Sequence, residues 1–308
     1  MPAPNSQADH EKELDLLIVG LGPAGVACAL QARREGLRLL AVGDEPVGGL
    51  LPAARRLDNL PTASGVAGAE LARRMAEQLD ERGVDCTEGR VTALAAAADG
   101  YAVGLGDGRG WRARCVCLAT GTRPRHWPVA LAGGRWLHRD ARSLPARLDG
   151  LRAAVVGGGE AALDTALSLR DRGAGVELWV RGRRLRASPA LRAEAQAAGV
   201  RPIWSTDPVS ARRQGPGWEL TARDGRQLVA DELVVCIGRE RRDELLAAVL
   251  PQPDSADPIV YRPGLFVAGD LIRGRDRYAA TAMGDGQRAA VACIRHLSGA
   301  DPPAGRPG

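Results

Sequence analysis

The chain has 308 residues, enough for two domains, and its 45% hydrophobic and 26% charged content is typical of a soluble globular protein. No apolar run approaches the roughly 18 residues that a membrane-spanning helix requires, so no membrane association is expected. The first dozen residues are polar and lack the apolar core of a secretion signal, which favours a frayed tail and a cytoplasmic protein. The formal net charge is +5, and Lys12 is the only lysine. This arginine excess suits an acidic partner or phosphates, or it reflects a GC-rich genome.

The first half of the chain opens with a dinucleotide-binding pattern. An apolar run at residues 16–19 is followed by Gly20-x-Gly22-x-x-Gly25, a helical pattern to about residue 35, and a second apolar run that ends at Asp44 and Glu45. The glycines permit a tight turn, close approach of a pyrophosphate, and close packing of the helix on the strand. The helix N-terminus attracts phosphate, and an acid after the second strand binds ribose hydroxyls. This order predicts a βαβ unit that binds a dinucleotide.

A second unit of the same kind begins about 135 residues later. The strand at 153–156 leads into Gly157-Gly158-Gly159-Glu160-Ala161-Ala162, and a helix to about residue 172 precedes a strand at 176–180. Here arginines rather than acids follow the second strand, at positions 181, 183, 184 and 186. Arginines at this place accommodate a 2′-phosphate, so the second site is expected to prefer NADPH over NADH. The alternative is a solvated loop in an arginine-rich protein.

The remaining pattern completes an α/β fold with two Rossmann-like, three-layer βαβ domains. A helix is expected over 66–82 and another over 279–297. Further strands are expected over 84–94, 101–105, 111–118, 200–204, 218–221, 228–235 and from 265, the last ending in Gly269-Asp270. Two other strands end in Ala119-Thr120-Gly121 and Ile237-Gly238, respectively.

The six cysteines contain no CxxC pair, so neither a zinc site nor a thioredoxin-like dithiol is indicated. Cys115 and Cys117 alternate on one expected strand and face the same side. Small buried hydrophobic residues are the favoured interpretation of these thiols. The alternative is a dithiol reductase that uses Cys115 and Cys117, the only close pair.

With these motifs placed, residues 14–298 resemble the thioredoxin reductase family of FAD-dependent pyridine nucleotide oxidoreductases. The resemblance implies an FAD domain built from 1–121 and 245–308, with an NADPH domain at 122–244 inserted into it. The expected linkers near Arg123 and after Gly238 match the two segments that connect the FAD and NADPH domains in that family. It also implies a homodimer, and no nucleic-acid partner is expected.

The resemblance implies the following cofactor-binding residues. For FAD they are Gly20, Gly22, Pro23, Ala24, Gly25, Asp44, Glu45, Gly48, Gly49, Leu50, Leu51, Asn59, Val91, Ala119, Thr120, Gly121, Gly269, Asp270, Arg277, Tyr278 and Ala279. For the nicotinamide nucleotide they are Gly157, Gly158, Gly159, Glu160, Ala161, Ala162, Arg181, Arg183, Arg184, Arg186, Ile237 and Gly238.

The chain differs from the family at the position of the redox-active cysteine pair. The family's CxxC followed by an acid would fall within residues 136–144, which contain no cysteine, so thioredoxin reduction by the usual route is excluded. His138 and Asp140 in this stretch are candidate proton donors, with surface exposure as the alternative. Val180, Gly182, Leu50 and Tyr278 replace the family's His, Arg, Gln and Gln, respectively. We hypothesise that Tyr278 stacks on the isoalloxazine and affects the rate of flavin reduction.

Three functions remain open from the sequence. The leading one is an FAD-dependent NAD(P)H oxidoreductase that reduces an external acceptor, as the dithiol-free ferredoxin–NADP reductases of this type do. The acceptor would be a ferredoxin or flavodoxin, a quinone or a small molecule. An acidic protein acceptor would dock on Arg123, Arg125, Arg273, Arg275 and Arg277. The alternatives are a flavin-dependent oxidase of a small substrate and a non-catalytic FAD-binding sensor or interaction protein.

Overall fold

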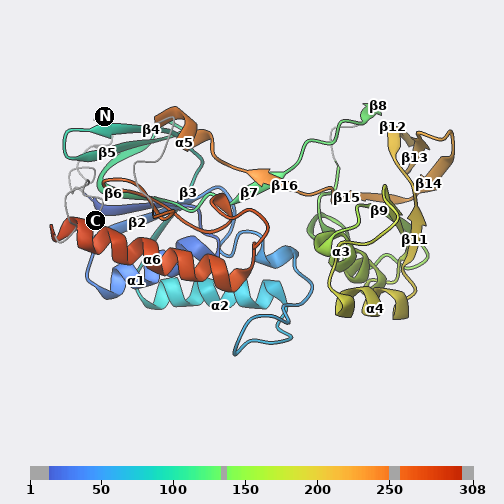
Figure 1. Ribbon diagram of the computed structural model, residues 1–308, viewed down its shortest axis with the longest axis horizontal. Helices are drawn as coiled ribbons and strands as arrows, with labels where there is room; N and C mark the ends of the chain where they lie inside the picture. The colour runs from blue at the N-terminus through green and yellow to red at the C-terminus, as the bar shows by residue number, and fades with distance from the viewer. Residues whose placement is uncertain (1–13, 133–136, 250–256, 300–308) are drawn as a thin grey trace, which may run out of the picture. The chain divides into compact units, whose positions relative to one another are not determined.

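The computed structural model describes residues 14–132, 137–249 and 257–299 of the chain (Figure 1). The expected N-terminal tail lies outside these residues. The described residues divide into two compact units. Unit 1 takes its residues from Met1–Leu51, Ala69–Thr122 and Arg241–Gly308, and unit 2 takes its residues from Pro52–Gly68 and Arg123–Glu240.

Unit 1 is built on a mixed sheet in the order β17-β18-β6-β1-β2-β3, with β5 also on β6 and β4 on β5. Strand β1 is buried along most of its length and pairs in parallel with both β2 and β6. Its near-continuous apolar sequence is what a parallel strand covered on both faces requires. The strand bounds are β1 Leu14–Val19, β2 Leu39–Gly43, β3 Asp85–Glu88, β4 Val91–Ala97, β5 Gly100–Leu105, β6 Gly110–Leu118, β17 Val260–Arg262 and β18 Leu265–Val267.

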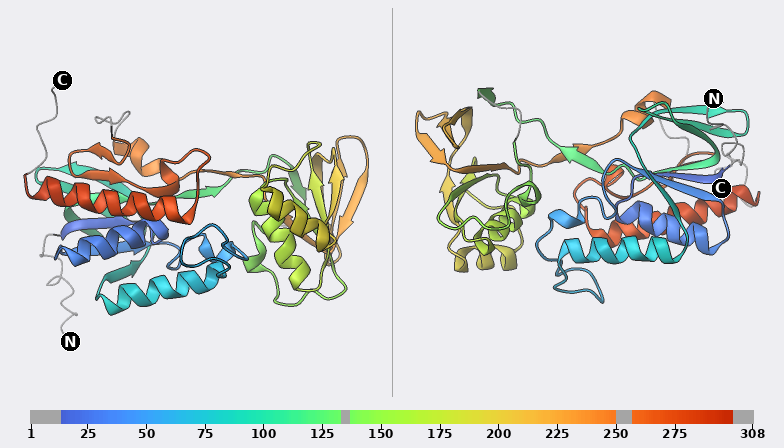
Figure 2. Two further views of the ribbon diagram at one scale, coloured as in Figure 1. Left: turned by 60° about the horizontal axis from the view of Figure 1, so that its bottom comes forward. Right: turned by 180° about the vertical axis from the view of Figure 1, so that it is seen from behind.

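Helices α1 (Pro23–Arg34) and α6 (Ala279–Leu297) lie side by side against one face of this sheet (Figures 1 and 2). Their contact is close because the facing residues are small: a Cβ added at Gly286 would lie 2.0 Å from the Ala24 carbonyl oxygen. Helices α2 (Gly68–Glu81) and α5 (Glu244–Val249) complete the unit. The C-terminal helix therefore packs on the helix of the first glycine motif.

Unit 2 has a parallel sheet in the order β11-β10-β9-β15 and a second sheet in the order β14-β13-β12-β8. Helices α3 (Glu160–Asp171) and α4 (Pro189–Ala197) pack on one face of the parallel sheet. The second sheet packs on the other face around Trp179 and Trp218, both buried. The bounds are β8 Ala130–Ala132, β9 Arg152–Val156, β10 Gly175–Val180, β11 Arg201–Trp204, β12 Pro208–Gln214, β13 Gly217–Ala222, β14 Gln227–Ala230 and β15 Glu232–Val235.

The two chain crossings pair with each other as a two-stranded ribbon of β7 (Thr122–Pro124) and β16 (Arg239–Arg241). Segment 52–68 follows β2 in the chain but belongs to unit 2. Arg55 holds it there: its backbone N–H donates to Asp164 at 2.8 Å, and its guanidinium contacts Asp171 and Glu194. The assignment of the two domains to FAD and NADPH stays a prediction.

The α/β class and the two Rossmann-like units expected from the sequence are confirmed. Two expected strands are each divided: 84–94 is broken at Gly89, and 228–235 contributes β14 and β15 to different sheets. Helix α4 and strand β12 were not expected from the sequence. Within the described residues, no helix is both long and apolar enough to cross a membrane.

Candidate functional site

The first glycine motif forms the tight turn that its spacing predicts. Gly20 has a φ of +107°, and a Cβ there would lie 2.3 Å from the Ala119 carbonyl oxygen. A Cβ at Gly25 would lie 1.8 Å from the Gly20 carbonyl oxygen, so both positions exclude any side chain. Gly22 differs, because a Cβ there would meet nothing within 4 Å. Its lack of a side chain is therefore unexplained by the protein's own packing.

Two predicted segments meet around this turn, at residues 48–49 and at Gly269. Gly49 has a φ of +56°, and a Cβ on it would lie 3.1 Å from the Gly22 Cα. Gly269 adjoins the first turn of α1, since its Cβ would lie 2.8 Å from that of Ala24. Gly48 donates its N–H to the Leu21 carbonyl at 2.8 Å. Gly286 of α6, which sequence reasoning missed, adjoins the same turn because a helix with small residues alone carries no motif.

This arrangement fits the pyrophosphate of FAD. The open space over Gly22 lies at the N-terminus of α1, where the first backbone N–H groups lack intrahelical partners and the helix dipole favours an anion. Pro23 occupies the first helical position, so the missing N–H falls where no helical bond is needed. Gly22, Ala24, Gly49 and Asp270 are the residues that would hold the group.

The acids after β2 are engaged by an arginine that the sequence did not indicate. Arg242 donates to Asp44 at 2.6 Å, and its Nη1 lies 3.7 Å from Glu45. Glu45 is the more exposed of the two acids, with 42% of its side chain accessible against 30% for Asp44. Glu45 is therefore the more accessible of the two acids, and its binding of ribose stays a prediction. The Arg242 carbonyl also accepts the Thr120 hydroxyl at 2.8 Å.

Other residues implied by the resemblance lie in different settings. Val91 and Leu51 are buried, and Asn59 belongs to the segment that packs in unit 2. Tyr278 precedes α6 and keeps 51% of its surface accessible, while Arg277 donates to the Arg273 carbonyl at 3.3 Å. Arg273 itself is paired with the buried Asp285. The flavin role of Asn59 stays a prediction.

The second glycine motif forms the same kind of tight turn at the end of β9. Gly157 has a φ of +149°, and a Cβ there would lie 2.3 Å from the Cys236 carbonyl oxygen. The Arg186 N–H donates to the Gly158 carbonyl at 2.6 Å, which ties the arginine loop to the turn. Glu160 accepts the Ser188 N–H at 2.6 Å. The structure thus brings the glycine turn and the expected 2′-phosphate loop together.

The four arginines of this loop, at positions 181, 183, 184 and 186, are all exposed. Across the described parts of the chain, their guanidinium groups make no hydrogen bond or ion pair. Most other arginines of unit 2 are paired with acids, for example Arg212 with Glu219 and Arg223 with Asp207. An uncompensated positive loop at a nucleotide turn fits a phosphate ligand.

Four of the six thiols lie in the core of unit 1. Cys28 of α1, Cys115 and Cys117 of β6, and Cys293 of α6 each have no accessible surface. A hydrogen bond with Cys117 and burial raise the pKa of Cys28, and a hydrogen bond with Cys115 and burial raise that of Cys293. Burial also raises the pKa of Cys236 to about 11. These neutral, enclosed thiols favour the structural interpretation over a dithiol reductase.

Thiol labelling is expected to distinguish these cysteines. In the native protein, 5,5′-dithiobis(2-nitrobenzoate) should react quickly with Cys86, which is the exposed cysteine, and only slowly with the others. All six should react in denaturant, because all six are free. Cys86→Ser should remove the fast phase and leave NADPH oxidation unchanged. Rapid labelling of two or more thiols in Cys86→Ser would instead show an accessible dithiol.

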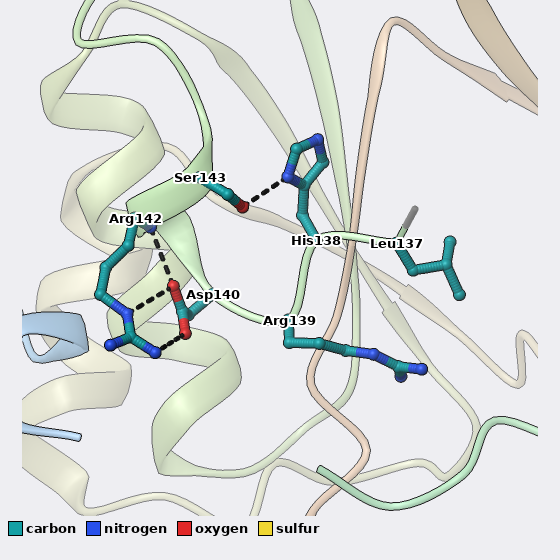
Figure 3. A pocket seen from close by; sticks show the side chains of 6 residues that line it. All are labelled: Leu137, His138, Arg139, Asp140, Arg142 and Ser143. Atoms are coloured by element: carbon teal, nitrogen blue, oxygen red, sulfur yellow. Dashed lines mark hydrogen bonds and ion pairs between the residues drawn. The ribbon is translucent and has the colours of Figure 1, made fainter. Parts of the chain in front are cut away.

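The stretch where the family carries its dithiol forms a pocket of about 610 Å³ in unit 2 (Figure 3). Its lining residues are Leu137, His138, Arg139, Asp140, Arg142 and Ser143. The backbone is fixed beside β15, because the Val235 N–H donates to the His138 carbonyl at 2.9 Å. Trp136 lies outside the described residues.

The two candidate proton donors in this pocket differ in character. Burial alone would raise the pKa of Asp140, but hydrogen bonds from the side chain and backbone of Arg142 outweigh burial and lower it. Asp140 also accepts the Arg142 N–H at 2.9 Å and caps the short helix at Ala141–Ser143. These contacts favour a structural anion rather than a proton donor. His138 instead contacts Ser143 and Glu232.

Comparison with known proteins matches residues 14–286 to the family described as pyridine nucleotide-disulphide oxidoreductase. The thioredoxin reductase of Streptomyces clavuligerus is 29% identical over 92% of this chain and 94% of its own. The 34.2 kDa protein in the rubredoxin operon of Clostridium pasteurianum is 25% identical over 94% of this chain and 99% of its own. The crystal structure of Lactococcus lactis thioredoxin reductase covers 93% of this chain and 100% of its own, with a TM-score of 0.84 at 24% identity.

Proposed function

Because the chain belongs to the pyridine nucleotide-disulphide oxidoreductase family and is an FAD-dependent NAD(P)H oxidoreductase, we propose that it passes electrons from NADPH through FAD to an external acceptor other than thioredoxin. The observation that carries this proposal is that the nucleotide-binding turns are kept while the redox-active dithiol is lost. Both glycine turns keep the geometry of a nucleotide cradle, whereas no CxxC is present and four thiols are buried in a core. When bound, FAD supplies the capacity to take a hydride and release two electrons.

The arginines that were expected to form a docking face bear on the choice between a protein and a small-molecule acceptor. Arg123 is paired with Glu240 at 2.8 Å, and Arg273 is paired with the buried Asp285. Charges already neutralised within the protein contribute less to recognition of an acidic carrier. The relative named for a rubredoxin operon supports an electron carrier, whereas the pocket at residues 137–143 supports a small molecule. We therefore propose a small molecule, rather than a protein electron carrier, as the acceptor.

The proposal predicts rapid bleaching of the flavin absorbance near 450 nm when the FAD-loaded protein is mixed anaerobically with NADPH. NADH should reduce the flavin at least tenfold less efficiently, because the arginine loop has no phosphate to bind. Stopped-flow absorbance measures both rates directly, and a thioredoxin should not reoxidise the reduced protein. FAD that stays oxidised with either nucleotide would contradict the proposal and favour an oxidase or a binding protein.

A further inference from the structure

Helix α6 contains a buried acid behind the first glycine turn. Asp285 keeps only 1% of its surface accessible, and among the charged side chains that the structure describes only Asp285 and Glu219 are buried. A carboxylate removed from water loses most of its hydration, so a buried acid keeps its charge only where the protein compensates it. The surroundings of Asp285 therefore determine where this charge acts.

Asp285 lies beside the residues that support the N-terminus of α1. Ala282, Asp285 and Gly286 are buried on one side of α6, and Figure 2 shows α6 lying along α1. Gly286 packs on the first turn of α1 without room for a side chain, because a Cβ there would meet the Ala24 carbonyl. A Cβ on Gly269 would lie 3.6 Å from the Ala282 Cβ. The buried acid therefore adjoins the place where the pyrophosphate of FAD is expected.

One arginine compensates the charge of Asp285. Arg273 follows the short helix at Gly269–Leu271, and its Nε donates to Asp285 Oδ2 at 2.9 Å while its Nη2 donates to Oδ1. Two N–H···O bonds from one guanidinium to one carboxylate form the strong, paired geometry that arginine favours. The hydrogen bond to Asp285 raises the pKa of Arg273, so the guanidinium stays charged. The ion pair as a whole therefore has no net charge.

The loop between the two residues is closed without the Arg273 guanidinium. The Arg273 carbonyl accepts a hydrogen bond from Arg277 Nε at 3.3 Å. The Thr281 hydroxyl accepts the Tyr278 N–H at 3.2 Å and lies 3.1 Å from the Asp276 carbonyl oxygen. These contacts fix the loop through backbone groups and one hydroxyl. Loss of the Arg273 charge is therefore expected to alter the electrostatics of the FAD site more than the course of the loop.

We propose that Arg273 is a charge-compensating residue for FAD binding, which neutralises Asp285 and so keeps an unpaired negative charge away from the phosphates of the cofactor. Like charges in a poorly hydrated region repel strongly, because the local dielectric constant is low. An unpaired Asp285 would oppose the attraction of the α1 N-terminus for the phosphates. The inference requires FAD at the first glycine turn and does not depend on which acceptor the protein reduces.

A charge effect and a packing effect predict opposite results in a double variant. Arg273→Gln leaves Asp285 buried and uncompensated, so FAD binding should weaken. Asp285→Asn removes the negative charge with almost no change in shape and leaves Arg273 positive, so FAD should bind at least as tightly as in the wild type. Arg273→Gln/Asp285→Asn restores a neutral pair and should restore binding. If the pair only packed the loop against α6, the double variant would bind no better than Arg273→Gln.

The test titrates FAD into the whole chain after its own FAD has been removed, and flavin fluorescence measures the Kd. Arg273→Gln should raise the Kd at least tenfold, whereas Arg273→Lys, which keeps the charge, should stay within threefold of the wild type. The Kd of the double variant should also lie within threefold of the wild type. Arg212→Gln is the matched control, because it removes the partner of the other buried acid, Glu219 in unit 2, and should leave the Kd within twofold.

Two results would overturn the inference. Wild-type FAD affinity in Arg273→Gln would show that the charge of Asp285 does not reach the cofactor. A double variant that binds FAD as weakly as Arg273→Gln would show a packing role instead. Urea unfolding identifies any variant that does not fold. If Arg273→Gln is such a variant, Asp285→Asn decides the question, since a tenfold loss of FAD affinity there would contradict charge compensation.

Discussion

Gly22→Ala is expected to leave the protein folded while weakening FAD binding at least tenfold. A Cβ at this position meets no protein atom within 4 Å, and the backbone there is extended, with φ −73° and ψ −177°. Loss of the glycine N-cap should therefore cost no more than about 1 kcal/mol of stability. A pyrophosphate at the α1 N-terminus needs that same space, and a tenfold loss of affinity corresponds to about 1.4 kcal/mol.

Gly25→Ala provides the matched comparison, because the same added methyl group would lie 1.8 Å from the Gly20 carbonyl oxygen. Its free energy of unfolding should fall by more than about 3 kcal/mol, since a backbone clash cannot be relieved by a side-chain rotation. Urea unfolding of the apoproteins measures stability, and flavin fluorescence measures the Kd for FAD. Wild-type FAD affinity in Gly22→Ala would show that the cofactor does not approach this turn.

The second large effect is expected at the exposed arginine loop of unit 2. Arg181→Ala and Arg186→Ala together should raise the KM for NADPH at least 30-fold and change the KM for NADH less than twofold. A charge-assisted hydrogen bond contributes about 1.5–3 kcal/mol, and each arginine offers one to the 2′-phosphate that NADH lacks. Stability should change little, because these side chains are exposed and make no hydrogen bond or ion pair in the described structure.

Arg201→Ala is the control for the arginine loop, because Arg201 is also exposed and lies at the opposite end of the neighbouring strand β11. It should leave both KM values within twofold of the wild type. Steady-state rates with ferricyanide as acceptor provide the measurement. Equal increases in the KM for NADPH and NADH in Arg181→Ala/Arg186→Ala would show that the loop contacts the shared part of the nucleotide, and the preference for NADPH would need another cause.

Arg242 shows why sequence patterns assign the ribose-binding acid incompletely. Asp44 and Glu45 both follow β2 at the expected spacing, so the sequence offers no choice between them. The ion pair of Arg242 with Asp44 joins residues 198 positions apart in the chain. Such a contact depends on the whole path of the chain through unit 2 and back. Only the folded unit shows that Arg242 hydrogen-bonds to Asp44 and that Glu45, which it approaches less closely, remains more exposed.

The sequence by itself determined both glycine turns, the strands that lead into them and the loss of the dithiol. These features are local, since a turn between a strand and the next helix needs only a few neighbouring residues of the right type. The tertiary structure decided which small residues meet across α1 and α6, that four cysteines are enclosed together, and that Glu232 lies beside His138. Those residues are far apart in sequence and carry no motif, so their chemistry appears only when β15 and the stretch at 137–143 lie side by side.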